Sequence, residues 1–93
     1  MSDYPSSISD LPNLGPKSIQ VLQRAGITSL SQLQALGAVA AYARAKAIEP
    51  TVSLNLLWAL EGALTGLHWR VVAREHRTSL LLALEDHQRG HRG

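Results

Sequence analysis

Residues 11–27 of the chain read LPNLGPKSIQVLQRAGI, and this stretch contains the strongest structural signals in the sequence. Pro16 suits the first position of a helix, because its missing N–H would be unpaired there in any case. Gly26 can adopt the left-handed backbone conformation that closes a helix. Between them, Ile19 and Leu22 are three residues apart, as one face of a helix requires. The stretch therefore predicts a short helix with a sharp start and a sharp end.

The turn before this helix has the features of a helix-hairpin-helix element. Leu11 and Leu14 provide apolar anchors, and Gly15 removes a side chain where the backbone must come close to another group. The turn leads into a helix N-terminus, whose free N–H groups and positive dipole end favour an anion. Lys17 stands in the first turn, where a cation is unfavourable for the helix, so a nearby phosphate explains it better. We predict a site that contacts nucleic-acid phosphates rather than bases. Its residues are Asn13, Gly15, Lys17 and Ser18.

A capping-box pattern predicts the start of a second helix. The side chains of Ser29 and Gln32 can each accept a hydrogen bond from the other residue's backbone N–H. We expect Gly37 to end or bend this helix. Residues 38–48 are mostly strong helix formers, and Pro50 stops the run.

The rest of the chain also favours helices. Ser53 can cap a helix over residues 54–65, and another is expected over residues 78–88. Residues 67–73 allow either a turn or a short helix. The side chains predicted to be buried in this part are Leu54, Leu57, Trp58, Leu64, Trp69, Leu80, Leu81 and Leu84.

Length and composition favour one all-α domain. The chain has 93 residues, of which 45% are hydrophobic but only 4% aromatic, with no Phe, so the core must be aliphatic. We expect about five short helices around one aliphatic core, an orthogonal SAM-like bundle that contains the helix-hairpin-helix. Residues 11–88 would form the domain, with a polar tail at 1–10 and a frayed tail at 89–93.

Charge and hydropathy narrow the classes of partner. The formal net charge is only +2, which is mild for a nucleic-acid binder. Three arginines would share one face if their segment is helical, and they form a candidate secondary basic patch, although a solvated surface is the simpler interpretation. They are Arg70, Arg74 and Arg77. No apolar run reaches the roughly 20 residues that span a bilayer, so we expect a cytoplasmic protein without a membrane partner.

For the other residues with reactive or metal-binding side chains, we expect structural roles. There are no cysteines, and no serine is tied to a histidine or acid by a catalytic motif, so we expect no enzyme activity, cofactor or metal. His87 and His91 have metal-binding spacing, but Gly90 lies between them. We expect His68 to be a turn residue with a satisfied ring. Glu61, in an apolar helix, is expected to pair with an arginine, either Arg44 or Arg70. Trp58 and Trp69 are expected in the core.

The hairpin residues resemble helix-hairpin-helix turns of DNA repair proteins and of the C-terminal domain of the RNA polymerase alpha subunit. A wider resemblance covers residues 11 to about 85. Residues 11–42, LPNLGPKSIQVLQRAGITSLSQLQALGAVAAY, and residues 53–69, SLNLLWALEGALTGLHW, are similar to the C-terminal domain of the TfoX/Sxy competence regulators. Segment lengths, glycine positions and the LWALEGA–G–W pattern agree together.

This resemblance implies a regulatory role in natural transformation. Family members help a cyclic-AMP receptor protein to activate genes for DNA uptake, so both DNA and transcription proteins are implied partners. Many members carry an N-terminal domain, and the sequence leaves open whether this chain stands alone or lacks one. Strong DNA-binding hairpins usually have glycine where this chain has Asn13, whose side chain would crowd a phosphate.

Two other function classes stay open. One is a protein-interaction module in which the hairpin is only scaffold, and the other is an accessory fragment of a nucleic-acid enzyme. The oligomeric state is not fixed by the sequence.

Overall fold

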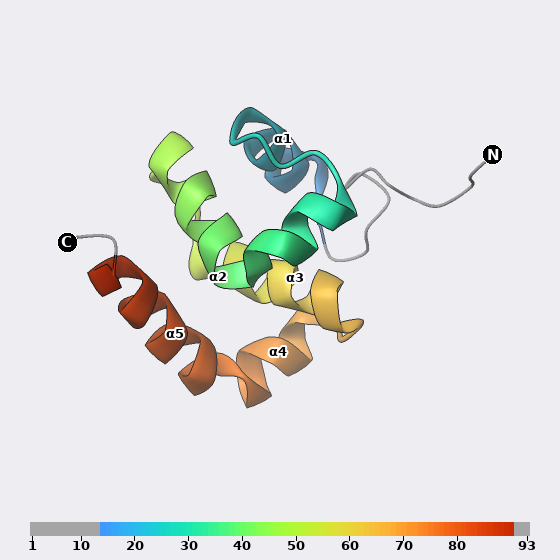
Figure 1. The fold of residues 1–93 in the computed structure, drawn as a ribbon. Coiled ribbons are helices and arrows are strands. Elements are labelled where there is room, and N and C mark those ends of the chain that lie inside the picture. The colour runs from blue at the N-terminus through green and yellow to red at the C-terminus, as the bar shows by residue number, and fades with distance from the viewer. Residues whose placement is uncertain (1–13, 91–93) are drawn as a thin grey trace.

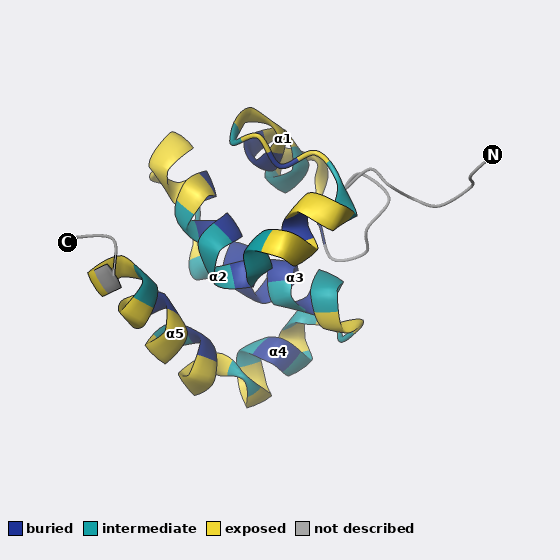
Figure 2. Ribbon diagram, viewed as in Figure 1, coloured by how far each residue is buried: buried dark blue, intermediate teal, exposed yellow. Residues whose placement is uncertain are grey.

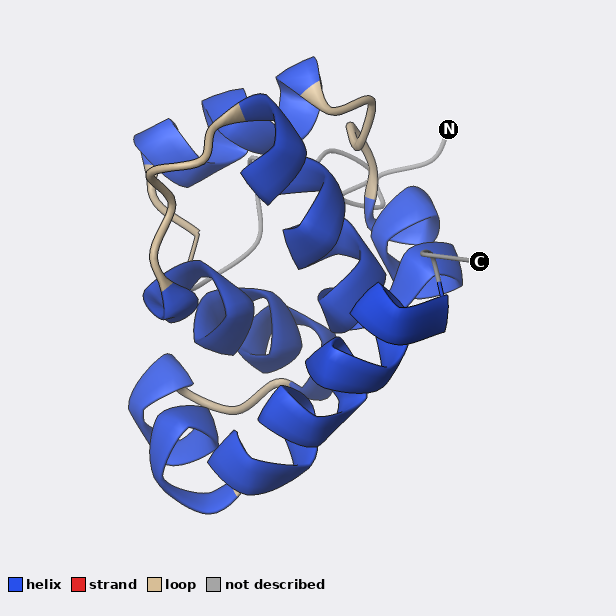
Figure 3. Ribbon diagram, turned by 90° about the vertical axis from the view of Figure 1, so that its left-hand side faces the viewer, coloured by secondary structure: helices blue, strands red, loops and turns tan. Residues whose placement is uncertain are grey.

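The computed structural model describes residues 14–90, in which every regular element is a helix (Figure 1). The helices are α1 (Pro16–Arg24), α2 (Leu30–Ile48), α3 (Leu54–Thr65), α4 (Trp69–Glu75) and α5 (Arg77–Gly90). Short connections join them, and α2 and α3 lie between α1 at one end and α5 at the other (Figures 1 and 3). The prediction of an all-α domain with five helices is confirmed. The predicted tail at 1–10 lies outside the described residues.

The two ends of α1 follow from its sequence. Pro16 is the first helical residue, and Gly26, just beyond the helix, has a φ of 86°. The N–H of Ile27 donates to the carbonyl of Leu22 at 2.9 Å, and the N–H of Gly26 donates to that of Gln23 at 3.0 Å. This is a Schellman closure, and its accompanying apolar pair, Leu22 and Ile27, is completely buried. The closure anchors the start of the α1–α2 turn in the core.

Helix α2 begins with the predicted capping box and bends where glycine was expected to act. The N–H of Gln32 donates to Ser29 Oγ, and the N–H of Ser29 donates to Gln32 Oε1, both at 3.2 Å. Gly37 has φ 82° and ψ 162°, which is not helical, so residues 30–36 and 38–48 form two helical halves that meet at a kink. Gly37 therefore bends the helix rather than ending it.

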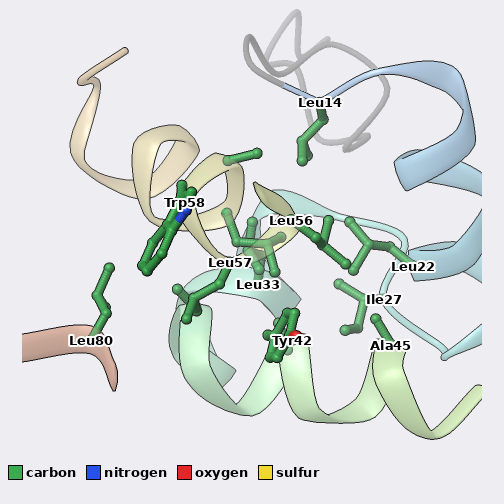
Figure 4. Close-up of a cluster of buried hydrophobic side chains, with 14 of the residues drawn as sticks. Leu14, Leu22, Ile27, Leu33, Tyr42, Ala45, Leu56, Leu57, Trp58 and Leu80 are labelled. Atoms are coloured by element: carbon green, nitrogen blue, oxygen red, sulfur yellow. The ribbon is translucent and has the colours of Figure 1, made fainter. Parts of the chain in front are cut away.

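Helix α3 is the centre of the core (Figures 2 and 4). It packs against both α2 and α4, and five consecutive residues from Leu56 to Leu60 are buried. The sequence predicted a one-sided helix with Leu54 and Leu64 inward, but these two are only half-buried. Leu56 and Leu60, which were not predicted, are buried instead, because a helix that is apolar all round can be covered on several sides.

The C-terminal segments are helical throughout the described residues. The ambiguous segment around Trp69 forms α4, and α5 starts one residue before the predicted start at 78 and continues to Gly90. Arg89 extends this helix with an ion pair to Glu85 at 3.2 Å. Leu80 and Leu84 point into the core as expected, whereas Leu81 is half-buried.

Candidate nucleic-acid interface

The predicted site lies at the N-terminus of α1, where the chain leaves the core. Leu14 is buried and points toward α3, so it anchors the segment that leads into α1 (Figure 4). Gly15 is the N-cap with an extended backbone, and its carbonyl accepts the N–H of Ile19 at 3.0 Å. Lys17 and Ser18 therefore occupy the first turn. The remaining members of the hairpin, Leu11 and Asn13, lie outside the described residues.

The first turn of α1 has backbone N–H groups without a partner among residues 14–90. No side chain in this range caps the helix, and Pro16 contributes no N–H. In the described part of the chain, the N–H groups of Gly15, Lys17 and Ser18 have no hydrogen-bond acceptor. Unpaired N–H groups at the positive end of a helix dipole form an arrangement that suits an anion.

Residues 14–90 leave the space in front of Gly15 open. Apart from Gly15 and its two neighbours in the chain, none of them has an atom within 4 Å of the position that a Cβ at Gly15 would take. Its φ of −81° is ordinary for any residue. The fold itself therefore does not require glycine here, and the missing side chain leaves room for an approaching group.

The local charge is positive. Lys17 is exposed and has no ion pair among the described residues, and the first turn of α1 contains no acidic side chain. At the other end of the helix, Arg24 lies 3.9 Å from Glu49 and is partly neutralised. Lys17 is thus the cation on α1 that has no counter-ion within residues 14–90.

Beside this helix lies a groove that the sequence did not predict. It has a volume of about 450 Å³ and runs between α1, the start of α3 and Trp69. Its polar lining includes Lys17, Ser18, Ser53 and Asn55. These residues are brought together only by the packing of α1 against the rest of the bundle, so no local sequence signal could have revealed the groove.

The candidate secondary patch is divided between two helices. Arg70 and Arg74 are one turn apart on α4, but α4 ends at Glu75 and Arg77 begins α5. The guanidinium of Arg70 lies 5.4 Å from the centre of the Trp69 ring. The guanidinium of Arg74 pairs with Glu75 at 3.2 Å. The expectation of one continuous helical face is therefore not met, because the helix breaks before Arg77.

His68 has the structural role that was predicted for it. It is the N-cap of α4, where Nδ1 accepts the N–H of Arg70 at 3.1 Å, and its ring stacks on Trp69 with centroids 5.8 Å apart. Trp69 itself is half-buried against the core, whereas Trp58 is buried in it.

The predicted ion pair of Glu61 is wrong. Among the described residues, its carboxylate pairs with neither Arg44 nor Arg70, while its backbone carbonyl accepts a hydrogen bond from the Thr65 hydroxyl at 2.8 Å. The side chain is half-buried, so water can solvate the charge without a partner.

The candidate histidine pair cannot be placed, because His91 lies outside the described residues. Within residues 14–90, no group of three or more His, Cys, Asp or Glu side chains could hold a metal ion. In the same range, no helix combines the length and apolar character that a membrane crossing needs.

Comparison with known proteins identifies the family. The sequence profile of the TfoX C-terminal domain matches residues 4–84. The chain belongs to the TfoX C-terminal domain family. Its fold is similar to the crystal structure, in a triclinic form, of an uncharacterized protein from Listeria monocytogenes, with a TM-score of 0.76 and 29% sequence identity. The similarity covers 89% of this chain and 94% of the Listeria chain. Among the curated proteins, none matches this chain.

Proposed function

We propose that this TfoX C-terminal domain is a non-enzymatic regulatory module that binds the DNA backbone at the N-terminus of α1. The observation that carries the proposal is the first turn of α1, in which the N–H groups of Gly15, Lys17 and Ser18 have no acceptor within the described residues. The exposed ammonium of Lys17 adds a positive charge at the same place. A phosphate would accept from these N–H groups and neutralise the lysine.

The biological setting of the proposal comes from the family resemblance. A role in the transcriptional control of competence implies DNA and a cyclic-AMP receptor protein as partners, and it places the domain in the cytoplasm. Because the proposed contacts reach phosphates rather than base edges, the domain itself would add affinity without sequence preference. Sequence choice would belong to the partner.

The size of the site limits the strength of binding. Lys17, the N-terminus of α1 and the second proposed contact through the arginines of α4 can together neutralise about two to four phosphates, so affinity should fall by roughly two to four decades per tenfold rise in salt. We expect weak binding at physiological salt. Arg70 and Arg74 on α4 form the second proposed contact, and each is already engaged with a neighbouring side chain.

A salt-dependent DNA titration tests the proposal. Lys17→Ala should weaken binding equally for unrelated sequences and lower the salt slope by about one. Gly15→Glu should abolish binding while the circular dichroism spectrum stays unchanged, because the φ of −81° accommodates any side chain. Lys46→Ala removes an exposed lysine on α2, together with its hydrogen bond to the Pro50 carbonyl at 3.2 Å, and as the control it should bind like the parent.

If the parent and both α1 variants bind DNA equally well, the proposal is wrong. Loss of binding in Arg70→Ala/Arg74→Ala alone would then move the DNA contact to α4. If no variant affects DNA binding but Lys17→Ala weakens capture of a cyclic-AMP receptor protein, the domain is a protein-interaction module and the hairpin belongs to its scaffold. The groove of about 450 Å³ beside α1 is the observation that favours this second candidate.

A further inference from the structure

Helix α5 leaves one flank uncovered. It packs on α2 and α4 through Leu80 and Leu84, and it forms an outer edge of the molecule (Figures 1 and 2). Leu82 is 57% exposed, more than any other large hydrophobic side chain among the described residues. A single exposed leucine is common on protein surfaces, so Leu82 marks a candidate surface, and the charges around it have to decide what binds there.

The uncovered flank is concave. A shallow hollow of about 310 Å³ lies along it. Its lining includes Arg77, Thr78, Leu81, Leu82, Glu85 and Gln88. These positions recur at intervals of three and four residues, so they lie along the length of the same helix surface. The surface is long enough for another helix to dock along it.

The charges on this surface are arranged symmetrically about its apolar centre. Arg77 and Glu85 are eight residues apart, and Leu81 lies midway between them. Arg77 has no ion pair within the described part of its own chain, whereas Glu85 pairs with Arg89 at 3.2 Å on the solvent-exposed surface of the helix and would have to share or exchange that partner. A second α5 docked antiparallel would place its own Glu85 opposite Arg77, and the two-fold axis would repeat this pair at the other end.

In this arrangement the apolar surfaces of the two copies meet at Leu81, and each Arg77 gains a carboxylate from the other copy. A partner of unrelated sequence would need to reproduce this pattern of charges, whereas a second copy supplies it by symmetry.

We propose that the α5 flank is a homodimer interface, with two copies packed antiparallel through Leu81, Leu82, Arg77 and Glu85. Helix pairs of this kind dock ridges into grooves, with their axes about 8–10 Å apart. The proposal does not depend on DNA binding, because the α1 site lies at the other end of the molecule (Figure 1).

Charge reversal tests the proposal on the full chain. Sedimentation equilibrium should detect a dimer for the parent. Arg77→Glu and Glu85→Arg should each weaken dimerisation by about tenfold or more, because each brings like charges together twice. The double variant Arg77→Glu/Glu85→Arg should restore it. A mixture of the two single variants should form a heterodimer, because its cross-pairs are again opposite in charge.

Two further variants complete the test. Leu82→Asp should give a monomer with unchanged helix content, because this side chain points away from the core. Lys17→Glu changes the net charge as Arg77→Glu does, but on α1, so it should dimerise like the parent while losing DNA binding. A parent that stays monomeric up to about 1 mM would overturn the proposal. So would single reversals without effect, or a double variant that fails to recover.

Discussion

Trp58 is the largest side chain in the core, and its ring lies between α3 and Leu80 of α5 (Figure 4). It is 5% exposed. Trp58→Ala should therefore lower the free energy of unfolding by about 3–5 kcal/mol, because truncating a buried indole leaves a cavity that the bundle can fill only in part. Urea denaturation followed by circular dichroism measures the change.

Trp69 provides the matched comparison, because it is half-buried and part of its ring contacts His68 and Arg70. Trp69→Ala should lower the free energy of unfolding clearly less than Trp58→Ala does. If both substitutions lower the free energy of unfolding only slightly and by the same amount, Trp58 does not contribute to core packing as its burial implies.

Tyr42 links stability to alkaline pH. Burial raises the pKa of its hydroxyl above the ordinary value of 10.0, because a buried phenolate would lose its hydration. The unfolded chain ionises this group at lower pH than the folded domain. Below pH 10 both states keep the proton and stability is unaffected, whereas stability falls as pH rises from about 10 toward the folded-state pKa.

Tyr42→Phe should remove this part of the alkaline decline. The measurement is the urea midpoint of parent and variant between about pH 8 and pH 11. The two curves should diverge only at the alkaline end. Parallel curves over the whole range would show that Tyr42 ionises equally in both states.

At the scale of the element, the capping box of α2 makes a specific contribution. Ser29 Oγ satisfies the N–H of Gln32, and Gln32 Oε1 satisfies the N–H groups of both Thr28 and Ser29. Ser29→Ala should lower the free energy of unfolding by about 1 kcal/mol. Ser31→Ala, two positions along the same helix and exposed, should change it by less than about 0.5 kcal/mol. Equal effects of the two substitutions would contradict a capping role.

The ends of helices were predictable from the sequence because caps are local. Pro16, Gly26, Ser29 and Ser53 each act within a few residues of themselves, and all four have the predicted roles. The burial of α3 was less predictable, because LNLLWALEGALT is apolar on every side. Which leucines are buried depends on the helices that pack against α3. Leu54 was predicted to be buried and is only half-buried, whereas Leu56 is buried.

In the candidate site, too, the local features could be predicted from the sequence, whereas the features that depend on tertiary packing could not. The open first turn of α1 follows from residues 14–18 alone, and the sequence predicted it. The groove beside it requires residues that follow more than thirty positions later in the chain, such as Ser53, Asn55 and Trp69, and nothing in the local pattern marks them. The arginine patch depended on one helix continuing past Glu75, and the break there separated Arg77 from the other two.

At the scale of the whole molecule, the two proposed surfaces lie at opposite ends, with α1 at one end and α5 at the other (Figure 1). A dimer through α5 would therefore present two α1 N-termini, each free to reach phosphates. Binding of the second one would benefit from the local concentration that the first creates.

The dimer should consequently show about twice the salt slope of the monomer when it binds a long DNA duplex. Leu82→Asp should halve the slope of the parent, and its remaining binding should still be removed by Gly15→Glu. Short duplexes that reach only one site serve as the control, since parent and Leu82→Asp should bind them alike. A slope that is the same for both proteins on long DNA would show that the copies do not act together.

The kink at Gly37 has a consequence for the conformational landscape of the domain. The segments on either side, residues 30–36 and 38–48, consist largely of good helix formers, so a single straight helix is a competing state of low energy. The φ of 82° and ψ of 162° belong to a region that is essentially restricted to glycine. Gly37→Ala should therefore lower the thermal midpoint, with a loss of about 1–3 kcal/mol, while it raises the helix content of the partly unfolded ensemble. Circular dichroism through the thermal transition would separate the two effects, and a variant that keeps the parent's midpoint would mean that the straight and bent forms are equally compatible with the packed core.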